Sequence, residues 1–377
     1  MTRERPPLTR DPDHLDLDAL GASIRVDLSA SAPGDRERIA RAWSGATRED
    51  DSSPVAVVRP DPSLPFDEAA AALSTRVTLA ALAARRGDLW MVHAAAVADD
   101  EGRVVLFSGR SGMGKTTLMS HLARDYAYVS DESVGVAADG RVLPYRKPLS
   151  IIDRTDSAKR QASPRSLGLR DLPTTASLRL HAIVVLDRDP LCTAPRVEEL
   201  EITDAISAIA PQCSYLAELA HPLATLTGHV SAVGGALRLR YREASEVVPL
   251  VAGLLASHRP RSPLPVAAQH VGSPRDPAGY VRTPVVDAVT IGGDRLALLR
   301  RGPHDETAIH LVDGIGPALW RAADGASFDE LLSAVIEEHG RPPHSDARAA
   351  VRTAVTALCD AGLMTAPAPE TPSRAEP

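Results

Sequence analysis

The stretch from Val104 to Leu122 places an apolar run, a glycine-rich turn and a helical pattern in immediate succession. Gly109 to Thr116 satisfies G-x-x-x-x-G-K-[ST], the pattern of a phosphate-binding loop. Glycines let successive backbone N–H groups close on phosphate oxygens, and the following helix directs its positive end at the same anion. We therefore predict a nucleotide site, with Lys115 between the β- and γ-phosphates of ATP and the Thr116 hydroxyl on Mg²⁺. The predicted nucleotide-binding residues are Gly109, Ser111, Gly112, Met113, Gly114, Lys115, Thr116 and Thr117.

Composition excludes several classes of protein. A formal net charge of −7 over 377 residues argues against a general nucleic-acid or anionic-membrane binder, and no apolar run approaches membrane-spanning length. The three cysteines are isolated, so neither a disulfide framework nor paired metal ligands are expected. The charged, proline-bearing start of the chain is unlike a signal peptide. We therefore predict a cytoplasmic protein.

The length predicts two domains, and the sequence changes character where they would meet. Residues 1–258 form the first predicted domain, in which a hairpin with its turn at Asp99 to Gly102 precedes the phosphate loop. Its first part, 1–87, contains a convincing helix but no recognisable chemistry, which favours structural cover over part of an acceptor site. Residues 259–283 are rich in Pro, Arg and Ser and predict a linker, 284–366 form a second small domain, and 367–377 are an expected disordered tail.

Carboxylates that follow apolar runs are the candidate chemical groups. Asp131 and Glu132 end one such run, and Asp187 ends another, Ile183 to Leu186. A carboxylate at a strand end can hold Mg²⁺ or take a proton from an acceptor hydroxyl, and spacing alone leaves Asp187 nearly as good a candidate as the pair. His93 competes with a purely structural role, and Arg146 and Lys147 could meet phosphate charge or lie in a solvated turn.

Three features in order give the region from His93 to about Val136 a family resemblance. They are Val92-His93 ahead of the loop strand, Gly114-Lys115-Thr116, and the run Val129 to Glu132 with its two carboxylates. This region resembles HPr kinase/phosphorylase and its related kinases, which share a core with phosphoenolpyruvate carboxykinase. The resemblance implies an α/β P-loop kinase domain.

The same resemblance implies a role for each matching residue. Asp131 matches the group that takes the acceptor proton, Glu132 the second carboxylate near metal and acceptor, and His93 the histidine that supports the first. Thr117 departs from HPr kinase proper, which carries Glu there, and the segment linked to phosphorolysis is not found. A relative with another acceptor is therefore expected.

The second domain has its own resemblance. Strands are expected at 288–291, 295–300 and 308–312, followed by helices at 316–323, 328–340 and 346–361. With Trp320 and Gly362-Leu363, this pattern resembles the PqqD-like fold, a small winged-helix module that binds leader segments of ribosomally made peptides. The resemblance implies that a leader pairs with the strand Ala308, Ile309, His310, Leu311 and Val312, beside the last helix. Residues 281–366 hold 8 basic and 12 acidic residues, which disfavours duplex DNA as the ligand.

Together these features predict an ATP- and Mg²⁺-dependent kinase that phosphorylates a Ser or Thr hydroxyl of a precursor peptide. The catalytic residues would be Asp131, Glu132, His93 and Lys115, and the metal would lie on Thr116 and Glu132. The alternative is a nucleotide-switched peptide-binding chaperone that transfers no phosphate, and kinase action on a small metabolite is a third possibility.

Overall fold

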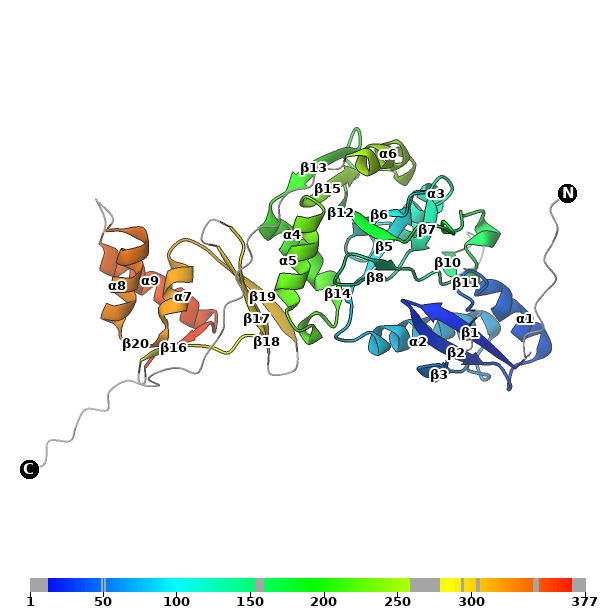
Figure 1. Ribbon diagram of the computed structural model, residues 1–377, viewed down its shortest axis with the longest axis horizontal. Coiled ribbons are helices and arrows are strands. Elements are labelled where there is room, and N and C mark those ends of the chain that lie inside the picture. Colours follow the sequence, from blue (N-terminus) through cyan, green and yellow to red (C-terminus); the bar gives the residue numbers. More distant parts are fainter. Residues whose placement is uncertain are drawn as a thin grey trace, which may run out of the picture. The chain divides into compact units, whose positions relative to one another are not determined.

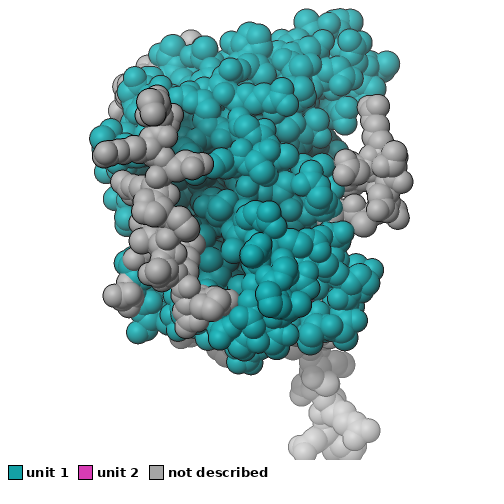
Figure 2. Space-filling model, turned by 90° about the vertical axis from the view of Figure 1, so that its right-hand side faces the viewer, with its two compact units in different colours: residues 1–220, 229–262 teal, residues 221–228, 263–377 magenta. Residues whose placement is uncertain are grey.

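The chain is a mixed α/β protein with several sheets. The computed structural model describes residues 13–48, 50, 52–152, 159–257, 279–292, 295–302, 306–341 and 346–367. The chain divides into two compact units: unit 1 comprises residues 1–220 and 229–262, and unit 2 comprises 221–228 and 263–377. Figure 1 shows the elements of both, and Figure 2 shows one face of unit 1 in teal.

A six-stranded sheet in unit 1 carries the phosphate-loop sequence (Figure 1). Its strand order is β13-β15-β12-β6-β5-β7. β6 and β15 run parallel to β12, whereas β5 is antiparallel to both of its neighbours, β6 and β7, and β13 is antiparallel to β15. The strands are β5 (Ala94–Ala98), β6 (Arg103–Ser108), β7 (Ala127–Ser130), β12 (Arg179–Arg188), β13 (Arg196–Leu200) and β15 (Ala236–Tyr241).

Two helices bury one face of this sheet. Alternate residues of β6 and β12, such as Val105, Phe107 and Val184, lie in one buried cluster with Leu118 of α3 (Lys115–Leu122) and Val251 of α6 (Val248–Ala256). This alternation follows from the two-residue period of a strand. The sheet thereby holds the start of α3, which follows the phosphate loop, in a fixed position.

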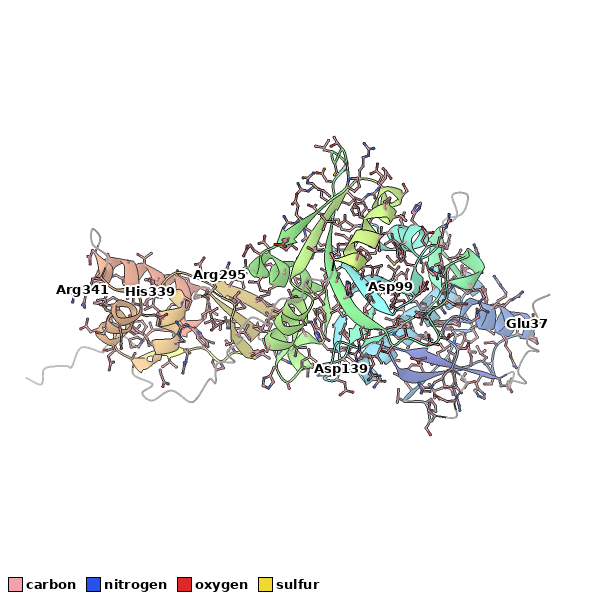
Figure 3. All side chains as sticks on the ribbon, turned by 45° about the horizontal axis from the view of Figure 1, so that its top comes forward. Glu37, Asp99, Asp139, Arg295, His339 and Arg341 are labelled. Carbon is pink, nitrogen blue, oxygen red and sulfur yellow. The ribbon has the colours of Figure 1, made fainter. Side chains whose placement is uncertain are left out.

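The expected hairpin ahead of the phosphate loop is confirmed. β5 pairs with β6 from Ala94 opposite Ser108 to Ala98 opposite Val104. Asp99, labelled in Figure 3, closes the turn because its carboxylate accepts hydrogen bonds from the backbone N–H groups of Glu101 and Arg103 at 3.1 and 2.9 Å.

The first part of unit 1 packs around its own core. Leu17, Ile24, Trp43 and Leu73 are buried in one cluster, which also contains Tyr145 from the segment after β9. The elements are β1 (His14–Ala19), β2 (Ala22–Asp27), α1 (Pro33–Ala42), β3 (Ala56–Val58) and α2 (Phe66–Ala84). The Tyr145 hydroxyl lies 2.8 Å from the hydroxyl of a threonine on α2, Thr78. This contact joins α2 to the residues just before Lys147.

Unit 1 is completed by two small sheets and further helices. One sheet has the order β14-β4-β8-β9, and β10 pairs antiparallel with β11. These elements are β4 (Trp90–Val92), β8 (Val134–Val136), β9 (Val142–Leu143), β10 (Leu149–Ile152), β11 (Lys159–Ala162), α4 (Ile202–Ile209) and β14 (Cys213–Ser214). Helix α5 (Pro222–Ala232) is divided between the units.

Acid should weaken unit 1 through one buried histidine. The His229 imidazole stacks on Trp90 with ring centroids 5.1 Å apart, and burial lowers its pKa below the ordinary 6.5. The unfolded chain then binds a proton at a higher pH than the folded chain, so the free energy of unfolding should fall as pH drops through 6.5. Urea denaturation above and below this pH should show a shallower fall in His229→Phe. An equally steep fall in the variant would contradict this assignment.

Among its described residues, unit 2 contains two three-stranded sheets and three whole helices, besides the first part of α5. β17 (Asp287–Thr290), β18 (Leu296–Arg301) and β19 (Thr307–Val312) form one sheet with β18 in the middle. Helices α7 (Gly316–Ala322), α8 (Phe328–His339) and α9 (Ala347–Asp360) follow. These bounds agree with the sequence expectations to within about two residues, the usual uncertainty of element ends.

A second sheet in unit 2 was not expected. It has the order β20-β16-β21, from β16 (Tyr280–Arg282), β20 (Asp324–Ala326) and β21 (Met364–Thr365). β16 lies inside the stretch expected to be a linker. It forms a strand because Val281 pairs with Asp324 and Thr365, which are distant in sequence. Residues 259–278 of that stretch and the tail from 368 lie outside the described residues.

Within the described residues, no helix combines the length and apolar composition needed to cross a lipid bilayer.

Candidate active site

Sheet topology brings the predicted site residues to one edge. β6 and β12 are parallel, so the phosphate loop after Ser108 lies at the same edge as the end of β12, where Val185 is opposite Ser108. β5 runs the other way, so its first residue, Ala94, is opposite Ser108 and brings His93 to this edge. β7 is antiparallel to β5, which returns Asp131 to the same place.

The loop has the backbone shape that its glycines permit. Gly112 and Gly114 have φ of +86° and +83°, values that residues with a Cβ rarely adopt. The Lys115 ammonium donates to the Gly109 carbonyl oxygen at 2.6 Å, and the Tyr241 hydroxyl donates to the Met113 carbonyl oxygen at 2.6 Å. These bonds hold the loop against the sheet and place α3 with its N-terminus facing the cavity beside it.

A cavity of about 440 Å³ opens at this edge. It is lined by His93, Ser111, Gly112, Gly114, Lys115, Thr116, Thr117, Asp131, Glu132, Lys147, Ser150 and Arg188. Most of the residues predicted for nucleotide, metal and catalysis therefore line one cavity. Gly109 and Met113 contribute loop backbone but do not line it.

The Asp131 carboxylate is held on three sides. The Thr116 hydroxyl donates to its Oδ2 at 3.2 Å, and the Tyr128 hydroxyl donates to its Oδ1 at 2.9 Å. The Lys147 ammonium lies 3.7 Å from Oδ1. Only 4 % of the Asp131 side chain is exposed, so these contacts are made with little competition from water.

Lys147 joins the two predicted catalytic carboxylates. Its ammonium lies 2.8 Å from Glu132 Oε2 and, as noted, close to Asp131. Burial on its own would lower the pKa of Lys147, but Asp131 and Glu132 outweigh burial and raise the pKa above its ordinary value. Lys147 is therefore charged, and it offsets the repulsion between two neighbouring carboxylates.

The remaining titratable groups give the cavity a positive balance. Burial lowers the pKa of Lys115, although Asp131 and Glu132 oppose the effect. Burial and then Lys115 lower the pKa of His93, so this imidazole is neutral near pH 7. Three cationic side chains, including Arg188, thus face two carboxylates in a cavity suited to a polyphosphate.

The pairing of the strands determines which of the two candidate carboxylates, Asp131 or Asp187, lies beside the phosphate loop. Asp187 is paired with Arg240 on β15, and the Arg240 Nε donates to its Oδ2 at 2.9 Å. It does not line the cavity, whereas the next residue, Arg188, does. Successive side chains of a strand point to opposite faces, which explains why only one of the two reaches the phosphate loop. Arg146 also lies away from the cavity, in an ion pair with Asp171 at 2.9 Å.

The donor set fits Mg²⁺ held together with phosphate. Among the described residues, no cluster of three or more His, Cys, Asp and Glu side chains is arranged around a potential metal position. Mg²⁺ commonly uses one or two carboxylates together with substrate phosphates and water. The Thr116 hydroxyl with the carboxylates of Asp131 and Glu132, of which Glu132 is 37 % exposed, matches that requirement.

Three residues of the site, two that line the cavity and one that holds Asp131, were not predicted from the sequence. Tyr128, Ser150 and Arg188 carry no motif and were not singled out. Of these three residues, only Tyr128 has a signal in the local sequence. It lies three positions before Asp131 in the same stretch, so its hydroxyl can approach the carboxylate. Arg188 reaches the cavity because β12 pairs with β6 and β15, which are distant in sequence, whereas Ser150 lies on β10, which pairs with the next strand, β11.

Loss of the Tyr128 hydroxyl should be costly. In Tyr128→Phe the buried Asp131 carboxylate loses a hydrogen bond, and the free energy of unfolding should fall by about 1–3 kcal/mol. Urea denaturation measures this difference. Tyr126→Phe, which changes a partly exposed tyrosine two residues earlier, is the control and should change stability by less than about 0.5 kcal/mol. Equal losses in the two variants would contradict the role of the bond.

The strand predicted to bind a leader peptide is β19, in unit 2. It occupies one edge of its sheet, and among the described residues its ladder runs along β18. Ala308 is exposed, Leu311 is 39 % exposed, Ile309 and His310 are half-buried, and Val312 is buried.

Comparison with known proteins finds a likeness among solved structures. No protein-family model matches the chain, and no curated protein matches it. Among solved structures, the chain is similar to the Hpr(Ser) kinase/phosphatase from Coxiella burnetii, with 15% identity and a TM-score of 0.24, over 44% of this chain and 93% of that one. Agreement at this level does not define the function of the chain, which rests on the site itself.

Proposed function

We propose that the protein is an ATP-dependent kinase that phosphorylates a Ser or Thr hydroxyl of a ribosomally synthesised peptide. The observation that carries the proposal is the convergence of the phosphate loop and a buried carboxylate in one cavity. Thr116 of the loop bonds directly to Asp131, so a phosphate on the loop would lie beside that carboxylate. This is the arrangement that phosphoryl transfer needs, because catalysis there is largely positioning and charge stabilisation.

Each group has a definite task in the proposed reaction. The backbone of the glycine loop and Lys115 bind the β- and γ-phosphates, and Thr116 with Glu132 would hold Mg²⁺, which supplies charge neutralisation. The acceptor oxygen attacks the γ-phosphorus as the bond to the bridging oxygen breaks and ADP leaves. The acceptor proton passes to the Asp131 carboxylate. Neutral His93 lies beside the carboxylate pair and supports its position.

The peptide part of the proposal rests on unit 2. The edge position of β19 and the exposure of Leu311 suit an extended segment that adds to the sheet and packs a side chain beside it. The three strands followed by three helices are the features on which the proposed PqqD-like character of this unit rests. Holding the leader on the same chain raises the effective concentration of the acceptor at the cavity.

One observation favours a second candidate, a nucleotide-switched peptide chaperone. The Lys147 ammonium pairs with both carboxylates, so a cation already engages them before any acceptor hydroxyl arrives. Nucleotide could then alter peptide affinity without phosphate transfer. The two candidates predict different products from the same mixture.

The experiment is a mass measurement on a candidate precursor peptide that contains a Ser or Thr. The protein, MgATP and the peptide are incubated, and the peptide is weighed by mass spectrometry. The kinase predicts a gain of one phosphate at a Ser or Thr. Release of free phosphate with an unmodified peptide would contradict the kinase and favour the chaperone.

A further inference from the structure

A second cavity of unit 1 lies in the part of the chain that showed no chemistry in its sequence. It has a volume of about 500 Å³ and is bordered by α1, the start of α2, β11 and the turn that follows β11. Its apolar lining consists of Ile39, Ala42, Trp43, Phe66, Ala70 and Ala162. We call this cavity the N-terminal groove.

The rim of the N-terminal groove carries more basic than acidic side chains, although Arg38 lies 3.6 Å from Asp67 and Arg165 pairs with Asp171 at 2.7 Å. Four arginines line it, with Asp67 as the one carboxylate: Arg38, Arg41, Arg160 and Arg165. Arg38 also covers the Phe66 ring, with its guanidinium carbon 3.3 Å from the ring centroid. This basic concentration contrasts with the net charge of −7 of the whole chain. Guanidinium groups bind carboxylates in a planar two-point geometry, so the charge complements an acidic ligand.

One hairpin borders both the N-terminal groove and the active-site cavity. Ser150 of β10 lines the active-site cavity, and Gln161 of β11 lines the groove. The two residues are direct cross-strand partners, and the Gln161 amide donates to the Ser150 hydroxyl at 2.9 Å. A peptide segment bound in the groove would therefore need to pass only this pair of strands to reach the carboxylates of the active site.

We propose that the N-terminal groove binds an acidic, apolar-bearing segment of the acceptor peptide next to the target hydroxyl. The proposal rests on the kinase function and specifies the surface that recognises the acceptor peptide. An apolar lining with a basic rim suits a peptide that alternates the two kinds of side chain, because the apolar residues are buried while the carboxylates meet the arginines. A small anion alone would leave the apolar lining unused.

The test uses two labelled peptides and a charge reversal. One peptide alternates Glu and Leu around a central Ser, and the other has Lys in place of each Glu. Fluorescence anisotropy measures their affinity for the wild-type protein and for Arg41→Glu/Arg165→Glu. We expect the variant to bind the Glu peptide about tenfold more weakly, as the loss of two exposed charge contacts and their reversal implies. The Lys peptide should bind the variant better than it binds the wild type.

Arg196→Glu is the matched control. Arg196 and Arg165 are both exposed arginines of unit 1, and each has a nitrogen 2.7 Å from a carboxylate oxygen. The control should bind the Glu peptide as the wild type does. Equal binding of both peptides, an unchanged affinity in the double variant, or equal loss in the control would overturn the proposal. Displacement of the peptide by inorganic phosphate at similar concentration would also overturn it, in favour of a small-anion site.

Phosphate transfer, followed in parallel, separates the two proposals. Charge-dependent peptide binding without phosphate transfer to peptide or water would leave the groove in place and end the kinase function. Transfer to the Glu peptide with the same KM in wild type and double variant would support the kinase and refute the groove. A raised KM with an unchanged rate at saturating peptide is the result expected if both hold.

Discussion

Asp131→Asn is expected to slow phosphate transfer to the peptide about 10²–10⁴-fold, the usual contribution of a positioned general base. The amide keeps the shape of the side chain, and its single oxygen can accept either the Thr116 or the Tyr128 hydrogen bond, but it cannot take the acceptor proton. ATP affinity should change much less than the rate. Single-turnover phosphorylation at saturating ATP measures the effect.

Asp187→Asn is the matched control for this variant. Asp187 also lies at the end of a strand at the same sheet edge, but it pairs with Arg240 and does not line the cavity. Its transfer rate should stay within a few-fold of the wild type. A wild-type rate in Asp131→Asn, or a large loss of rate in Asp187→Asn, would contradict the assignment of Asp131 as the group that takes the acceptor proton.

Lys147→Met should lower the free energy of unfolding by about 3 kcal/mol, the low end of the cost of breaking a buried ion pair. The low end applies because Glu132 is 37 % exposed, whereas Lys147 and Asp131 are 5 % and 4 % exposed. Removal of the ammonium leaves two neighbouring carboxylates without their shared cation. Urea denaturation in chelator-treated buffer gives the difference.

A surface ion pair supplies the contrast for Lys147→Met. Arg165→Met removes one side of the exposed pair with Asp171 and should cost less than about 1 kcal/mol. Added Mg²⁺ should restore more stability to Lys147→Met than to the wild type, because the carboxylates become available to the metal. Similar losses in the two variants would show that Lys147 does not hold the carboxylates together.

Local patterns predicted much of the scaffold. The strand, glycine loop and helix around Lys115, the hairpin turn at Asp99, helix α2 and the strands and helices of 287–360 all lie where they were expected. Each has a signal within a few residues: an apolar period, a glycine at a stop or a turn-forming carboxylate. The β16 sheet was missed because its short strands are paired over long distances in the sequence.

For the same reason, only part of the candidate site could be predicted from the sequence. Spacing could not separate Asp131 from Asp187, because both follow apolar runs; the pairing of Asp187 with Arg240 separates them. Arg188 reaches the cavity through the long-range pairing of β12 with β6 and β15, and Ser150 lines the cavity from β10 without a sequence motif. The sequence predicts the same basic turn for Arg146 and Lys147 and does not distinguish them. In the structure only Lys147 reaches the carboxylates of the site.

A crystal structure with Mg²⁺ and a non-hydrolysable ATP analogue tests the central claim most directly. The account predicts the γ-phosphate on the glycine loop, with the Lys115 ammonium within hydrogen-bond distance of its oxygens and the Asp131 carboxylate facing the phosphorus from the side opposite the bridging oxygen. A nucleotide bound elsewhere, or a γ-phosphate directed away from Asp131 into solvent, would contradict the transferase.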